Sequence, residues 1–238
     1  MHLHRPIARP LHWRTRTHPR PLLGRTTVFR PSWFWDRMAV RYARMPIADP
    51  AAYETKLEKT RAYLRPDSRV LEFGCGTGST ALVLAPRVAQ VHAIDTSAAM
   101  LAIAREKVQA AGIDNLSFEH TTLTDLDSPA GRWDVILGMN VLHLLPNRRD
   151  TLARAHALLK PGGVFISSTL CAADAPLGLR LLAPLVRALP LLPRISSLRL
   201  EGLTAELVAA GFEIEAQWRP ARHKAAFVVA RKPGRLDA

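Results

Sequence analysis

The sequence contains very little cysteine. Cys75 and Cys171 are its two cysteines among 238 residues, and neither has the paired spacing that holds zinc. Their scarcity argues against a disulfide framework and against a structural metal. We therefore expect no metal site and a reducing compartment, with the cytoplasm as the simplest choice.

Long apolar runs are also missing. The opening segment lacks the apolar core of a secretory signal, and no stretch is long and apolar enough to span a bilayer. The sequence shows no internal repeat. With 48% apolar residues, a chain of this length can bury one substantial core, so we expect a single folded domain.

Acidic residues are absent from the first thirty positions, which hold seven arginines, four histidines and four prolines. Without those arginines the formal net charge falls from +13 to +6. Because it has no helical or strand period, the segment 1–32 is predicted to be disordered, ahead of a domain at residues 33–238. A phosphate-binding arm and an arginine-rich transit peptide stay open as alternatives. The basicity is therefore weak support for a nucleic-acid partner.

Strand and helix patterns alternate along the middle of the chain. We predict strands at 70–73, 91–94, 116–119, 133–138 and 164–168, and helices at 79–88, 98–111 and 150–159. An amphipathic helix at 51–64 precedes them, with Asp49 as its cap and Pro66 as its stop, and "KPGG" at 160–163 is predicted to be a turn. The alternation predicts an α/β fold with a doubly wound, mostly parallel sheet.

The end of the chain departs from this alternation. After a helical "TAELVAAG", the segments "FEIEAQW" and "AAFVVAR" indicate two strands joined by "RPARHK". So short a connection cannot hold a crossover helix, and the two strands must form an antiparallel hairpin. The predicted sheet is thus seven-stranded and Rossmann-like, with a C-terminal hairpin that a plain dinucleotide fold lacks.

A glycine-rich loop, "VLEFGCGTG" at 70–78, links the first strand to the first helix of the alternation. A strand, a glycine turn and a helix N-terminus form a nucleotide-binding crevice. The spacing of Gly74, Gly76 and Gly78 differs from G-x-G-x-x-G, and no Gly-Lys-Ser/Thr follows. Asp95 ends the next strand, where it can accept hydrogen bonds from both hydroxyls of an unmodified ribose. The ligand is therefore predicted to be a nucleoside without a triphosphate.

Four segments in this order carry a resemblance: "VLEFGCGTG", "VHAIDTSAAML", "RWDVILGMNVLHLLP" and "LLKPGGVFISST". Over residues 33 to 232 the chain resembles the class I S-adenosylmethionine-dependent methyltransferases. The segment "FWDRMAVRYA" also resembles bacterial small-molecule enzymes of the kind that C-methylate quinones. The resemblance implies S-adenosylmethionine as cofactor and methyl transfer as the reaction.

The resemblance also implies cofactor-binding residues. Glu72 would pair with the ammonium of the methionine part; the structural alternative is a carboxylate that caps loop amides. Met100 would touch adenine or pack in the core, and Cys75 would pack beneath the loop. Thr122 stands where many relatives carry an acid for the adenine amino group, with Asp125 and Asp127 farther along. The full set is Glu72, Gly74, Cys75, Gly76, Thr77, Gly78, Asp95, Thr96, Ser97, Met100, Thr122, Gly138 and Asn140.

The sulfonium and methyl group of the cofactor are expected where the fourth strand ends, in "GMNVLHLL". Gly138 and Asn140 would face the sulfonium and its methyl group. Methyl transfer needs mainly alignment and exclusion of water, with a base added when the nucleophile is an alcohol, phenol or acidic carbon. His143 is the candidate base; the alternative is an inert, hydrogen-bonded histidine on the following helix.

The acceptor is expected to be a small molecule. Asn140 to His143 read Asn-Val-Leu-His, not the Asn/Asp-Pro-Pro-aromatic run of enzymes that methylate exocyclic amines of nucleic acids. A Pro-Cys nucleophile for cytosine chemistry is missing too, so nucleic acid is disfavoured. A binding module that keeps the cofactor but has lost transfer stays open as a different class of function.

An apolar insertion at 174–200 follows the fifth strand. It is leucine-rich, but Pro184, Pro190 and Pro193 break it and arginines interrupt it, so it cannot span a bilayer. We expect a lid that admits a hydrophobic acceptor. A homodimer face and a peripheral membrane contact are the alternatives.

Overall fold

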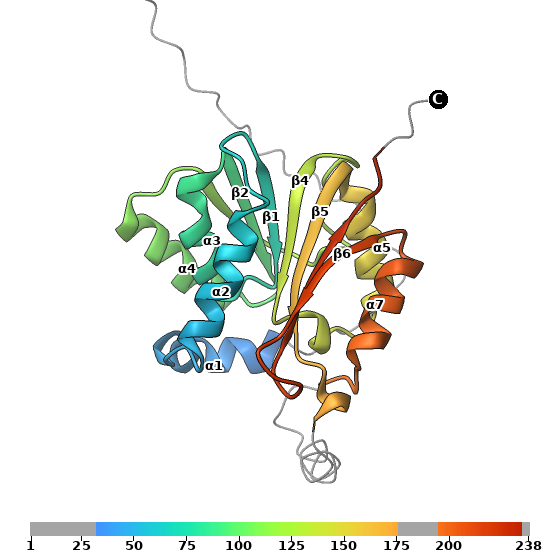
Figure 1. The fold of residues 1–238 in the computed structure, drawn as a ribbon. Coiled ribbons are helices and arrows are strands. Elements are labelled where there is room, and N and C mark those ends of the chain that lie inside the picture. The colour runs from blue at the N-terminus through green and yellow to red at the C-terminus, as the bar shows by residue number, and fades with distance from the viewer. Residues whose placement is uncertain (1–31, 176–194, 235–238) are drawn as a thin grey trace, which may run out of the picture.

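The computed structural model describes residues 32–175 and 195–234. A seven-stranded sheet with the order β3-β2-β1-β4-β5-β7-β6 runs through its centre (Figure 1). The strands are β1 Arg69–Phe73, β2 Gln90–Asp95, β3 Leu116–His120, β4 Trp133–Met139, β5 Leu159–Thr169, β6 Glu213–Trp218 and β7 Ala226–Arg231. The helices are α1 Ser32–Arg44, α2 Pro50–Arg61, α3 Ser79–Leu84, α4 Ala98–Ala111, α5 Arg148–Leu158 and α7 Leu200–Ala209, with short 3-10 turns at η1 Ala85–Arg87, η2 Leu142–Leu144 and η3 Ala172–Asp174.

The strand directions confirm the predicted sheet. β1 to β5 are parallel, whereas β7 pairs antiparallel with both β5 and β6. The order reverses at β1, which lies between β2 and β4. In an open α/β sheet, this switch point is where ligands bind, outside the carboxyl ends of the strands.

Alternating side chains of the strands build two cores, one on each face of the sheet. In β4, Ile136 packs on one face, with residues of α5 and α7. Its neighbours Val135 and Leu137 pack on the other, with residues of α2, α3 and α4. The result is a three-layer arrangement, and α1 lies across one end of the sheet (Figure 1).

The helix α2 begins as predicted and ends earlier. Asp49 caps it, because its Oδ1 accepts a hydrogen bond from the Ala52 amide at 3.0 Å, and Pro50 occupies the first turn. The last helical residue is Arg61, so Pro66 does not set the end. A turn at Ala62 to Leu64 follows, and a second turn at Arg65 to Ser68 leads to β1.

Two predicted boundaries were wrong. The helix expected at 79–88 ends at Leu84 and continues as the 3-10 turn η1, because Pro86 has no amide hydrogen to donate to the preceding turn. The "KPGG" segment belongs to β5 rather than to a turn. The pairing of β4 with β5 shifts register there, and Gly162, at φ +75°, donates its amide to the Lys232 carbonyl at 2.9 Å.

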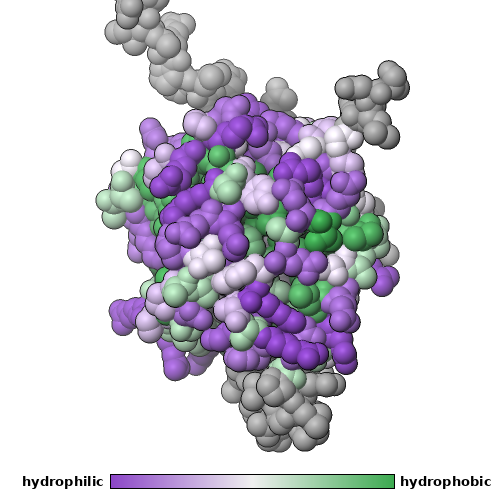
Figure 2. Space-filling model, in the orientation of Figure 1, coloured by the Kyte–Doolittle hydropathy of each residue, from purple (hydrophilic) through white to green (hydrophobic). Residues whose placement is uncertain are grey.

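The face shown in Figure 2 is mostly hydrophilic, with hydrophobic side chains in scattered patches. Among the described helices, none is long and apolar enough to cross a membrane. The predicted disordered segment, 1–32, lies outside the described ranges except for Ser32, which begins α1, and the predicted apolar lid, 174–200, lies outside them over 176–194.

Candidate cofactor and acceptor site

The loop between β1 and α3 is shaped by its glycines. Gly74 and Gly76 have φ values of +62° and +54°, in the left-handed region that favours glycine. A Cβ on Gly74 would collide with the side chain of Val141, whereas the nearest side-chain atom to a Cβ on Gly76 would be Cε1 of Tyr42, at 3.9 Å. Gly74 therefore lets two loops pack together, and Gly76 lies on the more open side.

Asp95 holds this loop from the end of β2. Its Oδ2 accepts a hydrogen bond from the Gly76 amide, and its Oδ1 accepts one from the Ser97 amide, both at 2.8 Å. Burial raises the pKa of Asp95, and these amide donors oppose the rise. Each carboxylate oxygen can accept a further hydrogen bond, so the group can still bind hydroxyls of a ligand.

Glu72 is a buried acid beneath the same loop. Its side chain is 2% exposed, and its Oε2 has no hydrogen-bond partner in the described part of the chain. Burial raises the pKa of Glu72 to about 8, with a further contribution from the charge of Asp95 and an opposing one from the Ala81 amide. A buried carboxyl group with an unpaired oxygen fits a ligand that brings a cation. The ammonium of S-adenosylmethionine meets that requirement.

The helix α1 covers the loop. Asp36 accepts hydrogen bonds through Oδ1 from the Ser97 hydroxyl at 2.7 Å and from the Ala99 amide at 3.1 Å, at the start of α4. Tyr42 lies near Gly76 and is 43% exposed, and its pKa is raised by partial burial of the hydroxyl end and by the charges of Asp95 and Glu72. Sequence reasoning missed Asp36 and Tyr42, although both lie in the segment quoted for the resemblance. Asp36 could have been noticed, because it is the one acid in the basic segment "FWDRMAVRYA".

Several predicted cofactor residues make contacts that hold the loop in place. Thr77 is buried, and its hydroxyl and carbonyl oxygens accept hydrogen bonds from Lys107 Nζ at 2.9 and 3.2 Å. Cys75 donates its amide to the Ile94 carbonyl, and its sulfur is buried, which raises the pKa of the thiol. Met100 is buried at the start of α4. Gly78, at φ +72°, packs against Phe118. Direct contact of these residues with the cofactor stays a prediction.

The residues expected near adenine take part in local contacts. Thr122 Oγ1 donates to Asp125 Oδ2 at 2.7 Å and accepts from the Asp125 amide at 3.1 Å. The Thr96 carbonyl accepts a hydrogen bond from His120 Nε2 at 2.9 Å. Asp125 is therefore tied to Thr122 and lies beside it, so both remain candidates for the adenine amino group.

Asn140 marks the end of β4. It is the one non-glycine residue with positive φ in the described ranges, at +57°. Its amide donates to the Ser168 carbonyl at 2.7 Å, and its Oδ1 accepts from the Ser168 hydroxyl at 3.2 Å. Gly138 lies inside the sheet, where a Cβ would meet the ring of Phe73 at 2.7 Å. Asn140, rather than Gly138, presents a side chain at this end.

His143 lies in the 3-10 turn η2, not on the following helix as expected for the inert alternative. Its side chain is 8% exposed, and Nδ1 has no partner within the described ranges. Burial lowers the pKa of His143 to about 4. At neutral pH the ring is therefore uncharged and a weak base, which favours a structural role.

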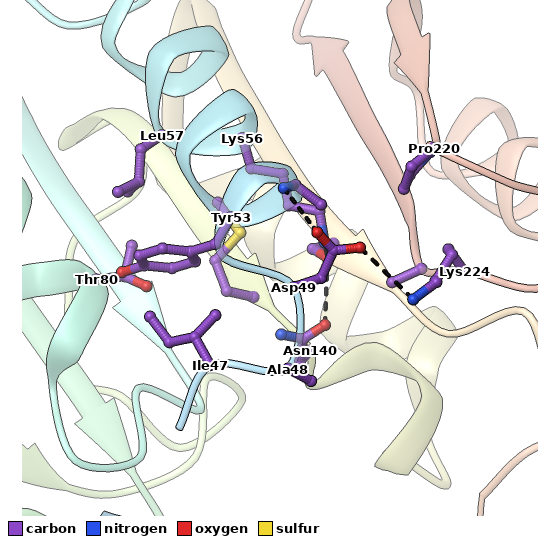
Figure 3. A pocket seen from close by; sticks show the side chains of 14 residues that line it. Ile47, Ala48, Asp49, Tyr53, Lys56, Leu57, Thr80, Asn140, Pro220 and Lys224 are labelled. Carbon is purple, nitrogen blue, oxygen red and sulfur yellow. Dashed lines mark hydrogen bonds and ion pairs between the residues drawn. The ribbon is translucent and has the colours of Figure 1, made fainter. Parts of the chain in front are cut away.

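A cavity of about 260 Å³ opens beside Asn140, at the carboxyl ends of β4 and β5 (Figure 3). It is bounded by α2 and by the connection between β6 and β7. Its lining consists of Ile47, Ala48, Asp49, Ala52, Tyr53, Lys56, Leu57, Thr80, Met139, Asn140, Ser168, Pro220, Lys224 and Ala225. Of these, only Asn140 was among the predicted site residues, although Met139 and Ser168 lie in the segments quoted for the resemblance.

The geometry can be compared with known proteins. A family model described as a methyltransferase domain matches residues 45–217. The chain belongs to the class I S-adenosylmethionine-dependent methyltransferases. S-adenosylmethionine is the methyl donor of this family, which agrees with the Glu72 oxygen that lacks a partner among the described residues.

Curated relatives align with part of the chain. It is 33% identical over 102 residues to a ubiquinone biosynthesis O-methyltransferase of Ruegeria pomeroyi, covering 43% of this chain and 41% of the relative. It is 39% identical over 102 residues to a trans-aconitate 2-methyltransferase of Deinococcus radiodurans, covering 42% and 37%. The match thus spans about two fifths of the length of each of these relatives.

A solved structure shows the same fold. The S-adenosylmethionine-dependent methyltransferase of Mesorhizobium loti superposes with a TM-score of 0.62 at 24% identity. The superposition covers 77% of this methyltransferase and 99% of that protein. At this identity the likeness concerns the fold alone.

Proposed function

We propose that this methyltransferase binds S-adenosylmethionine around the loop at Gly74 to Gly78 and transfers its methyl group to a small, largely apolar acceptor. The observation that carries the proposal is the partnerless Oε2 of buried Glu72, close to Asp95. One acid suits the ammonium of the methionine part, and the other suits the ribose hydroxyls.

The chain's own residues contribute alignment. The cofactor supplies a methyl group on a sulfonium, which is a strong leaving group. Glu72 holds the methionine part and Asp95 the ribose of the bound molecule, and Tyr42 lies beside the loop between them. Asn140 lies where the acceptor must arrive, at the end of β4. Holding the reacting atoms in line and excluding water lowers the barrier without a charged catalyst.

The acceptor is assigned to the cavity beside Asn140. Leu57, Met139 and Pro220 give it an apolar wall, and its volume of about 260 Å³ suits a small molecule or the reacting end of a larger one. Two relatives are named for ubiquinone biosynthesis and for trans-aconitate, which supports a small-molecule acceptor over a nucleic acid.

We place the protein in the cytoplasm, because Cys75 and Cys171 are both free.

Two measurements test the proposal. Calorimetry should detect binding of S-adenosylmethionine and of its demethylated product; heat from neither ligand would refute the cofactor site. Methyl-labelled cofactor incubated with a cell extract should then label a small product that can be extracted into organic solvent. Binding without any labelled product would favour the module that has lost transfer. Label that stays with nucleic acid would show that the acceptor is a nucleic acid rather than a small molecule.

A further inference from the structure

We propose that the acceptor carries a carboxylate and that Lys56 binds it in the cavity beside Asn140. The inference rests on the proposed function, because it assigns part of the acceptor of that reaction. It follows from the hydrogen bond of Lys56 to Ser168 and from the charges around the cavity, where Figure 3 shows Asp49, Lys56 and Lys224.

Lys56 is a partly buried cation that lines the cavity. Within residues 32–175 and 195–234, its Nζ donates one hydrogen bond, to the Ser168 hydroxyl at 2.9 Å. An ammonium group has three donors, so two more are available to a ligand. Burial lowers the pKa of Lys56, because the charged form is poorly solvated there. A cation in that situation gains from an anionic partner.

The nearby carboxylate is already engaged. The charge of Asp49 partly opposes the lowering of the Lys56 pKa by burial. Asp49 also caps α2 through the Ala52 amide and forms an ion pair of 3.5 Å with Lys224. The charged residues of the cavity lining are Asp49, Lys56 and Lys224, which leaves one net positive charge. This imbalance favours an acceptor with one negative charge.

Hydrogen bonds connect Lys56 to Asn140, the residue beside which we expect the methyl group to be transferred. Ser168 accepts from Lys56 and donates to Asn140 Oδ1 at 3.2 Å, so the three side chains form one hydrogen-bonded chain. An acid group held by Lys56 therefore lies next to Asn140, at the end of β4. The apolar wall of Leu57, Met139 and Pro220 then accommodates the rest of the acceptor.

The competing source of a carboxylate is the methionine part of the cofactor. Tyr53 and Thr80 line the same cavity, and the charge of Glu72 adds to the effect of burial that raises the pKa of Tyr53. The test must therefore separate cofactor binding from acceptor binding.

The test uses matched acid and amide probes on the full chain. Calorimetry first measures the binding of S-adenosylhomocysteine to the wild type, to Lys56→Met, to Lys56→Arg and to Lys59→Met. Lys59 lies on the same helix, is exposed, and has its Nζ 5.9 Å from the ring centroid of Trp218, so its variant is the charge-matched control. The complexes are then titrated with benzoate and benzamide, and with octanoate and octanamide.

We expect all four proteins to bind S-adenosylhomocysteine similarly. The wild type should bind at least one acid about tenfold more tightly than its amide, as a charge-assisted hydrogen bond predicts. Lys56→Met should remove this preference, while Lys56→Arg and Lys59→Met should keep it.

Other outcomes overturn the inference in distinct ways. Equal binding of acids and amides by the wild type, or binding of neither, refutes an acid-binding site. A similar loss in Lys59→Met shows a general charge effect. Weaker binding of S-adenosylhomocysteine by Lys56→Met assigns Lys56 to the cofactor. Failure of the wild type to bind S-adenosylhomocysteine refutes the proposed function itself.

Discussion

At the scale of single residues, two buried groups show how burial sets chemistry. Glu72 and His143 are both nearly inaccessible, and burial raises the pKa of the acid while lowering that of the imidazole. Both side chains are therefore neutral near pH 7 without a ligand. Glu72 can gain charge when a cationic ligand arrives, whereas His143 has no described partner that would stabilise a charge.

Glu72 should couple cofactor binding to pH. Its pKa of about 8 lies above its ordinary value of 4.5, so its contribution to folding is complete below pH 4.5 and is lost as pH rises through 8. Pairing with an ammonium requires the carboxylate, so affinity for S-adenosylmethionine should weaken below pH 8, by at most about tenfold per pH unit. Calorimetry in buffers of different ionisation enthalpy should show proton release on binding at pH 7.

Glu72→Gln provides the control for that coupling. The amide cannot titrate, so the variant should bind the cofactor at least about tenfold more weakly and show little pH dependence between 6 and 8. Wild-type affinity, or an unchanged pH profile in the variant, would disprove the pairing.

His143→Ala should retain turnover. Since the ring is buried and its pKa is about 4, its loss should leave the rate within a few-fold of the wild type and destabilise the fold by roughly 1–3 kcal/mol. Activity with labelled cofactor and denaturant unfolding measure the two effects. A large loss of rate without loss of stability would instead identify a base.

At the scale of elements, the site depends on contacts between segments that are distant in sequence. The loop after β1 packs against the loop after β4 through Gly74 and Val141, and α1 is joined to the start of α4 through Asp36. These contacts hold the loop between two neighbouring elements. Its conformation is thus a property of packing as much as of its glycines.

Gly74→Ala should be more destabilising than Gly76→Ala. Both sites have positive φ, which costs an alanine about 1–2 kcal/mol, but only Gly74 faces a collision with Val141. Denaturant unfolding of the two variants measures the difference. Adding Val141→Ala should recover part of the loss at Gly74 and none at Gly76. Equal destabilisation of the two single variants would contradict the packing account.

Asp36→Ala should weaken cofactor binding. Without the bonds to Ser97 and Ala99, α1 is held less firmly against the start of α4, and stability should fall by about 1 kcal/mol. Affinity for S-adenosylhomocysteine should fall several-fold, as measured by calorimetry. Arg41→Ala, an exposed change on the same helix, is the control and should leave the affinity unchanged. Equal affinity in the wild type and both variants would show that α1 does not contribute to cofactor binding.

At the scale of the whole molecule, the sheet has a helical layer on each face, and the site gathers residues from several elements. Glu72 belongs to β1, Asp95 to β2 and Tyr42 to α1. A ligand that contacts all three binds only the folded chain. Cofactor binding should therefore stabilise the molecule as a unit rather than one segment.

Thermal unfolding should show this stabilisation. S-adenosylhomocysteine at about 100 times its Kd should add about 2.7 kcal/mol, which corresponds to roughly 5–10 °C in Tm for a chain of this size. Differential scanning calorimetry with increasing ligand measures the shift. A Tm that does not depend on ligand concentration would contradict a site formed only by the folded chain.

The order of strands and helices was predictable from the sequence, because it depends on residues that are neighbours in the chain. Alternating patterns predicted a mostly parallel sheet, and the short "RPARHK" connection predicted the antiparallel hairpin. The position of Asp95 relative to the glycines predicted a nucleoside ligand in the same way, and the resemblance implied the role of Glu72. Local exceptions, at Pro86 and in "KPGG", arose where a proline or a bulge interrupted the pattern.

Only the tertiary structure decided which distant side chains meet. Lys56 and Ser168 are 112 positions apart, and Asp36 and Ser97 are 61 apart, yet each pair forms a hydrogen bond. No local pattern specifies such pairs, because they arise when helices pack on a twisted sheet. The burial that alters the pKa values of Glu72 and His143 has the same origin. The sequence by itself thus determined the elements and the kind of cofactor, while packing determined the cavity, its charge and the chemistry of its acids and bases.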